Sequence, residues 1–140
     1  MKTLNWSKQN VLVTGGTGFI GANLAVALNK SGANVVVVER DSRSLNSLKA
    51  LGKYKEITIV SGSISDPTLM ERVFNEHDIH YCFHLAAQAI VGPANHSPLS
   101  TFEANIKGTW CVLEAARNAR NLRGVVVASS DKAYGVHEKL

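Results

Sequence analysis

The chain has 140 residues, which is enough for one domain built around a single hydrophobic core. Hydrophobic residues make up 45% and charged residues 19%, as in globular proteins, and no apolar run approaches the ~20 residues that a membrane-spanning helix needs. The net charge of +4 would suit an anionic ligand, but it is too small and too scattered to indicate nucleic-acid binding, and no membrane partner is expected.

Apolar segments alternate with helical patterns along the chain. Strands are predicted at Asn10–Thr14, Asn34–Glu39, Ile57–Val60, His80–Leu85 and Gly124–Ser129. Helices are predicted at 18–30, 41–51, 67–77 and 99–120. This alternation predicts an α/β fold with a doubly wound parallel sheet of the Rossmann type. The expected strand order is 3-2-1-4-5, with a ligand crevice between the first and fourth strands.

Residues at the ends of these helices support the assignments. Asp41 and Ser42 are expected to cap the second helix, which Gly52 would close. Asp66 followed by Pro67 is typical of a capped helix start with proline in the first helical position. Gly32 is expected to end the first helix in a left-handed conformation.

The first strand runs directly into a glycine-rich turn, Thr14-Gly15-Gly16-Thr17-Gly18-Phe19-Ile20-Gly21. Its glycines fit both G-x-G-x-x-G and G-x-x-G-x-x-G. The first glycine would allow the tight turn, Gly18 would let backbone N–H groups approach a pyrophosphate, and Gly21 would let the helix pack against the strand. A helix that starts here offers free N–H donors and a positive dipole end to phosphates. The turn therefore indicates dinucleotide binding, with an ordinary glycine-rich α/β turn as the alternative.

The end of the second strand carries an acid where dinucleotide-binding proteins need one. Glu39 lies 18 residues after Gly21, and a carboxylate there can bind the adenosine ribose hydroxyls. Arg40 and Arg43 are either solvated loop charges or partners for a 2′-phosphate. Because Glu39 would repel that phosphate, NAD is favoured over NADP as the cofactor.

Together with three further motifs, the glycine turn resembles a known family. These motifs are His84-Leu85-Ala86-Ala87-Gln88, Asn105-Ile106-Lys107-Gly108-Thr109 and Ser129-Ser130-Asp131-Lys132-Ala133-Tyr134-Gly135. The chain resembles the N-terminal part of the extended short-chain dehydrogenase/reductases, in the NAD-dependent epimerase/dehydratase family that acts on nucleotide sugars. The resemblance covers essentially the whole sequence.

The resemblance implies a set of cofactor-binding residues. Those around the pyrophosphate would be Gly15, Thr17, Gly18, Phe19, Ile20 and Gly21. Glu39 and Arg40 would lie at the ribose, and Gly62, Ser63 and Ile64 under the adenine. Leu85, Ala86, Ala87 and Gln88 would pass the central part of the cofactor, and Asn105 would hold the backbone around the site.

Three residues of these motifs and turns have simpler interpretations. Ser63 is equally well explained as a turn residue. His84 lies on an apolar strand, where a hydrogen-bonded core histidine is the favoured interpretation. Asn105 could be an ordinary polar residue of a helix. No histidine has the ligand spacing of a zinc site, so no metal is expected.

The last motif would supply the chemistry. By resemblance, Ser130 would bind near the sugar O4, and Asp131 and Lys132 would separate dehydration from epimerisation. Losing water across C5 and C6 needs one group to take the C5 proton and one to protonate the leaving hydroxyl. The Asp-Lys pair is similar to that of CDP-glucose 4,6-dehydratases. The alternative is a loop ion pair without a chemical role.

The family's Tyr-x-x-x-Lys motif does not occur in this sequence: the residues four positions after Tyr54, Tyr81 and Tyr134 are not lysines. We therefore expect an N-terminal fragment, inactive alone, of an NAD-dependent nucleotide-sugar 4,6-dehydratase or 4-epimerase that works through a transient 4-keto sugar. The alternatives are a catalytically inactive NAD-binding module and a protein-interaction module.

The expected partner is a nucleotide-diphosphate sugar, and the resemblance also implies a homodimer formed through the helix at 99–120. In relatives the interface also contains the helix that bears the Tyr-x-x-x-Lys motif. Because this sequence lacks that motif, Ile106, Trp110 and Leu113 would lie uncovered and drive self-association, unless they face the sheet. Cys82 and Cys111 lie in apolar surroundings and are expected to be buried and reduced, in a cytoplasmic protein.

Overall fold

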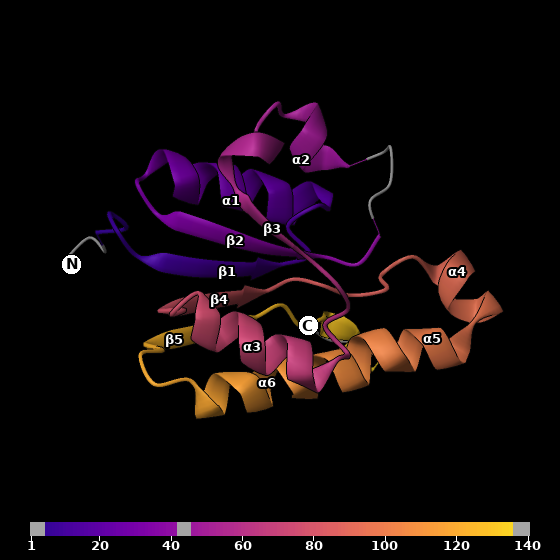
Figure 1. The fold of residues 1–140 in the computed structure, drawn as a ribbon. Coiled ribbons are helices and arrows are strands. Elements are labelled where there is room, and N and C mark those ends of the chain that lie inside the picture. The colour runs from indigo at the N-terminus through magenta and orange to yellow at the C-terminus, as the bar shows by residue number, and fades with distance from the viewer. Residues whose placement is uncertain (1–4, 42–45, 136–140) are drawn as a thin grey trace.

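The computed structural model describes residues 5–41 and 46–135. Five parallel strands form one sheet in the order β3-β2-β1-β4-β5, which confirms the predicted topology (Figure 1). The strands are β1 (Asn10–Thr14), β2 (Asn34–Glu39), β3 (Thr58–Ser61), β4 (Tyr81–His84) and β5 (Gly124–Val127). The first two have the predicted bounds, because each is a run of buried apolar residues bounded by turn residues.

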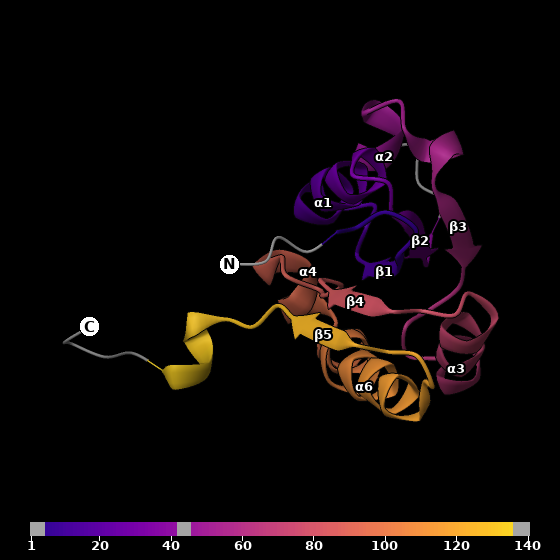
Figure 2. The same cartoon turned by 90° about the vertical axis from the view of Figure 1, so that its left-hand side faces the viewer.

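Helices cover both faces of the sheet (Figure 2). The helices are α1 (Phe19–Lys30), α2 (Ser47–Ala50), α3 (Pro67–Glu76), α4 (Val91–His96), α5 (Pro98–Phe102) and α6 (Gly108–Asn118). A π-helical turn, Glu103–Lys107, joins α5 to α6, and short 3₁₀ turns lie at Tyr54–Glu56 and Asp131–Tyr134. Helices α1 and α2 lie on one face, and α3 and α6 on the other, so the sheet is doubly wound.

The side-chain alternation of the central strand explains the two layers of core. Val11 and Val13 of β1 pack in the cluster that contains α1 residues such as Leu28. Leu12 points to the opposite face and packs in the cluster that contains Phe74 of α3 and Val112 of α6. Because both faces of β1 are fully buried, the strand has no polar face, as expected for the centre of a parallel sheet.

The second helix starts later than predicted. The cap is Asn46 and not Asp41: the Asn46 Oδ1 accepts hydrogen bonds from the Leu48 and Lys49 backbone N–H groups at 2.9 and 3.2 Å. Asp41 instead pairs with the neighbouring Arg40, and Ser42 lies outside the described residues. The expectation for Gly52 is confirmed, since its φ is +68°.

The long helix predicted at 99–120 is interrupted. It consists of α5, the π turn and α6, and it ends at Asn118. At this turn, the Thr109 hydroxyl donates to the Asn105 backbone carbonyl at 2.7 Å. The Asn105 side chain accepts a hydrogen bond from the backbone N–H of Gln88, in the segment that follows β4. π turns inside α-helices are frequent at functional sites. The preceding helix α4 was not predicted; Pro93 lies in its first turn, where proline is tolerated.

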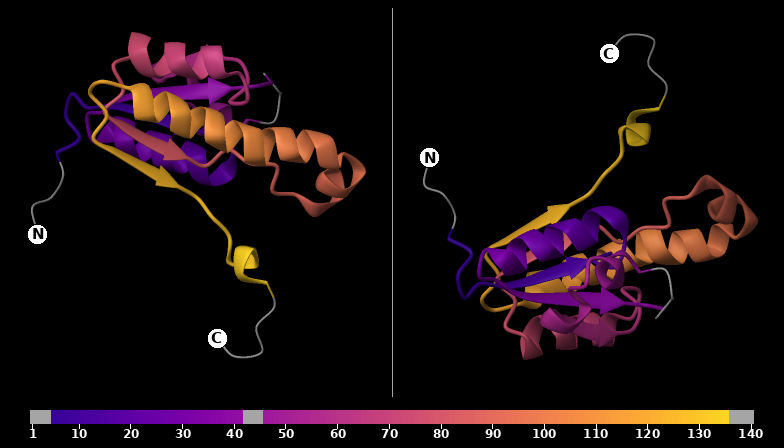
Figure 3. Two further views of the ribbon diagram at one scale, coloured as in Figure 1. Left: turned by 90° about the horizontal axis from the view of Figure 1, so that it is seen from below. Right: turned by 90° about the horizontal axis from the view of Figure 1, so that it is seen from above.

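Helices α4 and α5 project beyond the carboxyl edge of the sheet, whereas α6 packs on its face (Figure 3). Cys82 and Cys111 are unpaired and buried, as expected, and burial raises the pKa of the Cys82 thiol to about 12. Among the described residues, no helix has both the length and the apolar character needed to span a membrane.

Candidate functional site

The turn between β1 and α1 packs directly against the chain that follows β4. Gly15 has a φ of +70°, and its carbonyl accepts a hydrogen bond from the Gly18 N–H at 3.0 Å. A Cβ on Gly15 would lie only 2.8 Å from the backbone of Leu85 and of Ala86. A Cβ on Gly21 would overlap the Gly15 carbonyl. These glycines are therefore required by the close approach of backbone to backbone.

The contacts of two glycines differ from the sequence-based expectation. Gly21 was expected to let α1 pack against the strand, but it allows α1 to approach the Gly15 carbonyl within the turn itself. Gly16 makes the close contact with the sheet, because a Cβ there would lie 2.5 Å from a methyl group of Val37 on β2.

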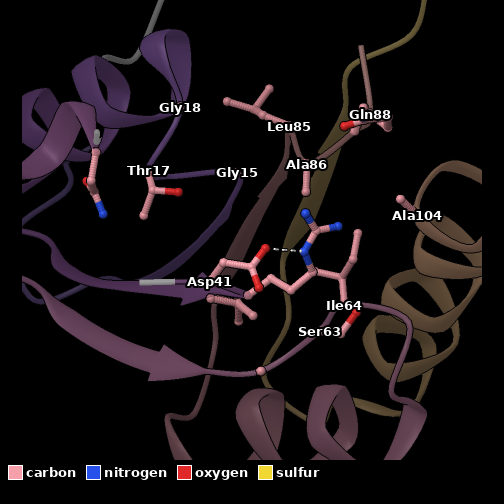
Figure 4. Close-up of a pocket in the computed structure, with 15 residues that line it drawn as sticks. Gly15, Thr17, Gly18, Asp41, Ser63, Ile64, Leu85, Ala86, Gln88 and Ala104 are labelled. Atoms are coloured by element: carbon pink, nitrogen blue, oxygen red, sulfur yellow. Dashed lines mark hydrogen bonds and ion pairs between the residues drawn. The ribbon is translucent and has the colours of Figure 1, made fainter. Parts of the chain in front are cut away.

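An open cavity of about 300 Å³ lies beside this turn, at the carboxyl ends of the strands (Figure 4). It brings together eleven of the predicted cofactor residues: Gly15, Thr17, Gly18, Arg40, Gly62, Ser63, Ile64, Leu85, Ala86, Ala87 and Gln88. Crevices at this edge, where the strand order reverses, are where open α/β sheets bind ligands. Figure 4 shows the glycine turn on one side of the cavity and Ser63 and Ile64 on the other.

The cavity wall formed by residues 85–88 is held at three points. Thr14 receives two of its N–H groups: Leu85 donates to the Thr14 carbonyl at 3.2 Å and Ala86 to the Thr14 hydroxyl at 3.3 Å. Asn105 binds both backbone groups of Gln88, at 2.7 and 3.2 Å. Asn105 thus lies behind the wall and fixes its position, without lining the cavity itself.

A buried histidine connects Thr14 with Thr109, which is hydrogen-bonded to Asn105. His84 is 2% exposed; its Nδ1 lies 2.7 Å from the Thr14 hydroxyl and its Nε2 lies 3.0 Å from the Thr109 hydroxyl. Because Thr109 donates its proton to the Asn105 carbonyl, it accepts from Nε2–H, and Nδ1 accepts from Thr14. This confirms the interpretation of His84 as a hydrogen-bonded core residue. Burial lowers its pKa.

Glu39 ends β2 but does not line the cavity. Its side chain is buried, and its carboxylate accepts hydrogen bonds from the Asn46 amide at 2.5 Å and from the Tyr54 hydroxyl at 2.7 Å. The next two residues, Arg40 and Asp41, do line the cavity, and the Arg40 Nε lies 2.9 Å from the Asp41 Oδ2.

Ser63 is a turn residue that also lines the cavity. Its hydroxyl accepts from the Ser65 N–H at 3.2 Å and lies 2.8 Å from the Ser65 hydroxyl, as in a serine turn. The same residue lines the cavity next to Ile64. Being a turn residue therefore does not exclude contact with a ligand.

The remaining predicted site residues lie outside the cavity. Phe19 and Ile20, in the first turn of α1, are 80% and 70% exposed. Ser130 and Asp131 follow β5 and are exposed, with the Ser130 hydroxyl 3.3 Å from an Asp131 carboxylate oxygen. Lys132 belongs to the 3₁₀ turn Asp131–Tyr134, and its side chain lies outside the described part of the structure.

Sequence reasoning missed four residues that line the cavity: Val38, Asp41, Asn46 and Ala104. Asp41 and Asn46 were detectable in principle, because polar residues that follow a strand at this edge of a parallel sheet are placed for binding. Val38 and Ala104 carry no signal, since each is a small apolar residue in an apolar pattern.

The chain matches the family model described as GDP-mannose 4,6 dehydratase over residues 12–140. UDP-glucuronate 4-epimerase 1 of Arabidopsis thaliana is 35% identical over 136 residues, which cover 94% of this chain and 32% of the relative. The dTDP-D-glucose 4,6-dehydratase of Dictyostelium discoideum is 33% identical over 131 residues, covering 91% of this chain and 30% of the relative. The chain thus spans about a third of the length of these relatives.

Solved structures of epimerases share the fold. The UDP-glucose 4-epimerase of Thermotoga maritima, solved with UDP-glucose, has a TM-score of 0.81 and 34% identity, covering 94% of this chain and 41% of that one. The enzyme of Bifidobacterium longum, solved with NAD+ and UDP, has a TM-score of 0.79 and 29% identity, covering 94% and 40%. These matches confirm the resemblance to nucleotide-sugar epimerases and dehydratases, and the chain belongs to the GDP-mannose 4,6 dehydratase family.

Proposed function

We propose that this chain binds NAD(H) as the cofactor-binding part of a nucleotide-sugar 4-epimerase or 4,6-dehydratase. The observation that carries the proposal is the cradle at Gly15, where no side chain fits between the glycine turn and the backbone of Leu85 and Ala86. The start of α1 supports it, because Gly18 is its N-cap and no side chain caps the helix. Its first N–H groups and positive dipole end suit a pyrophosphate.

Bound NAD would accept a hydride from the sugar C4 and return it, so that a 4-keto sugar forms transiently. The residues after β5 would act on the sugar: Ser130 near O4, and Asp131 and Lys132 as the proton-transferring pair of a dehydration. The family relatives include both 4-epimerases and a 4,6-dehydratase. The Asp-Lys pair favours the lyase reaction over the isomerase reaction.

The 140 residues alone are expected to bind the cofactor without turnover. A positioned general base contributes typically about 10²–10⁴-fold to a rate, and no tyrosine of this sequence begins a Tyr-x-x-x-Lys motif. Formation of NADH or of a sugar product well above a heat-treated control would contradict this expectation.

We also propose a homodimer formed through an outer stripe of apolar side chains on α5, the π turn and α6. The outer stripe consists of Leu99, Phe102, Ile106, Trp110 and Leu113, which are 42–83% exposed. Exposed apolar patches of this kind mark protein contacts. A cytoplasmic location is proposed as well, supported by the two unpaired, buried cysteines.

Calorimetric titration with NAD+ and NADH tests the proposal. We expect saturable binding by the unaltered chain and none by Gly15→Ala, because the new methyl group would occupy the cradle. Gly124→Ala is the matched control, since a Cβ there would make only ordinary contact with Tyr81, at 3.6 Å. Absence of binding at millimolar cofactor would reject the proposal.

A further inference from the structure

A ring of hydrogen bonds holds the cavity wall from behind. It is attached to the backbone of two residues that line the cavity, Ala86 and Gln88 (Figure 4). This wall ring consists, in order, of Ala86, Thr14, His84, Thr109, Asn105 and Gln88. Because the ring begins and ends on the same short segment of chain, each of its bonds contributes to the position of the wall.

The bonds of the wall ring allow one arrangement of protons. The Thr109 hydroxyl donates to the Asn105 carbonyl, so it accepts from the His84 Nε2–H. The imidazole then carries its one proton on Nε2, and its Nδ1 accepts from the Thr14 hydroxyl. The Thr14 oxygen in turn accepts from the Ala86 N–H at 3.3 Å. The arrangement therefore requires His84 in its neutral form.

A proton added to His84 would break this arrangement. Both nitrogens of an imidazolium are donors, so the Thr14 hydroxyl could no longer donate to Nδ1. Thr14 is fully buried, so water does not replace the lost partner, and a buried polar group without a partner costs free energy. The same hydroxyl binds the Ala86 N–H, so the change would reach the cavity wall directly.

The surroundings of His84 favour the neutral form. Both side chains that hydrogen-bond to it are uncharged hydroxyls, and its paired residue on β5 is Val127. Cys82, two residues away on the same face of β4, has a pKa raised to about 12 by burial, and burial also raises the pKa of Cys111 on α6. The charged ends of the π turn pair with each other at 2.7 Å. Burial accordingly lowers the pKa of His84.

We infer that His84 is a positioning residue for the cofactor: its neutral form holds the cavity wall in the geometry that binds NAD(H), and cofactor affinity falls when the imidazole is protonated. The inference rests on the proposed function, because it requires the cofactor to lie against the wall. His84 and Thr109 lie behind the cavity lining, so both act through the backbone of Ala86 and Gln88.

Calorimetric titration with NAD+ at pH values from 8 to 5 tests the pH dependence. The affinity of the unaltered chain should be constant above the ordinary histidine pKa of about 6.5 and fall at lower pH. His84→Gln removes the titrating group. Its affinity for NAD+, although weaker at pH 8, should vary less with pH. Near-UV circular dichroism at each pH verifies that the chain is folded during the titration.

Substitutions at Thr109 distinguish the hydrogen bond from general stability. Thr109→Val removes the acceptor of the His84 N–H and should weaken NAD+ binding at pH 8 roughly three- to tenfold, the effect of losing one buried hydrogen bond. Thr109→Ser should restore the affinity. Val112→Ala is the matched control on the same helix, because Val112 is fully buried in the core but is not a member of the wall ring. It should lower stability and keep the NAD+ affinity.

Three results would overturn the inference and leave the proposed function intact. One is the same pH dependence of NAD+ affinity in the unaltered chain and in His84→Gln. Another is a Thr109→Val variant that binds NAD+ like the unaltered chain. The third is a Val112→Ala variant that loses as much affinity as Thr109→Val, which would make the effect one of general stability. Failure of the unaltered chain to bind NAD+ would instead reject the proposed function.

Discussion

The segment between β4 and β5 builds two very different surfaces. Its inner side forms the cavity wall, where Asn105 and Thr109 connect the Gln88 backbone to the buried His84. Its outer side presents the outer stripe, with Trp110 61% exposed. The inner side depends on close backbone approach and satisfied hydrogen bonds, whereas the outer side depends on neither. Substitutions should therefore be costly on one side and tolerated by the fold on the other.

The largest effect is expected at the glycine turn, where the wall meets α1. Gly21→Ala places a methyl group against the Gly15 carbonyl, and overpacking of this kind costs about 1–3 kcal/mol of unfolding free energy. Cofactor binding should be lost with it. Urea unfolding and NADH titration measure the two effects. If the variant bound NADH like the unaltered chain, the close packing would not be required for the site.

Behind the wall, Thr109→Val should lower the unfolding free energy by about 1–3 kcal/mol, because it leaves the buried His84 N–H without an acceptor. Thr109→Ser retains the hydroxyl and should recover most of that loss. Urea unfolding of the two variants distinguishes hydrogen bonding from packing. Equal losses in both would show that the threonine methyl group, and not the hydroxyl, stabilises this region.

The same histidine predicts a pH dependence. Burial lowers the pKa of His84 below the ordinary value of about 6.5, so the unfolded chain binds its proton more readily than the folded chain. The contribution of neutral His84 to the unfolding free energy is therefore complete at pH values above the ordinary pKa. It falls as the pH drops through that value toward the lowered pKa of the folded state. Between pH 8 and pH 5, the unfolding free energy should fall less for His84→Gln than for the unaltered chain.

The smallest effect on stability is expected on the outer stripe. Trp110→Glu should change the unfolding free energy by about 0.5 kcal/mol or less, because the side chain is exposed. It should nevertheless reduce self-association, which sedimentation over a concentration series measures. Leu51→Glu is the matched control, since Leu51 is also an exposed apolar residue, 42% exposed, but lies at the end of α2. A chain that stays monomeric before substitution would contradict the proposed dimer.

The parts of the molecule also differ in how well the sequence predicts them. The glycine turn and β1 were predictable because local rules decide them: buried β-branched residues form the strand, and the left-handed φ of Gly15 favours glycine. The exposure of Ile106, Trp110 and Leu113 is likewise confirmed. The orientation of Glu39 was not predictable, because it depends on Tyr54, which is 15 residues away and is brought close only by the fold.

The π turn was unpredictable for a related reason. Its residues have ordinary helical propensities, and the contact of Asn105 with Gln88 spans 17 residues. The cap of α2 was misplaced because Asp41 and Asn46 are both good capping residues, and only the three-dimensional structure shows which one meets the helix N–H groups.

The two buried cysteines make the chain a convenient object for labelling. Only a thiolate reacts with maleimides, and a thiol with a pKa of about 12, such as that of Cys82, is almost wholly protonated at neutral pH. Cys111 is also buried, and burial raises the pKa of its thiol as well. A cysteine introduced at Leu113 would therefore react first, without prior removal of the natural cysteines. A spin label attached there would report how far apart two copies of the chain lie.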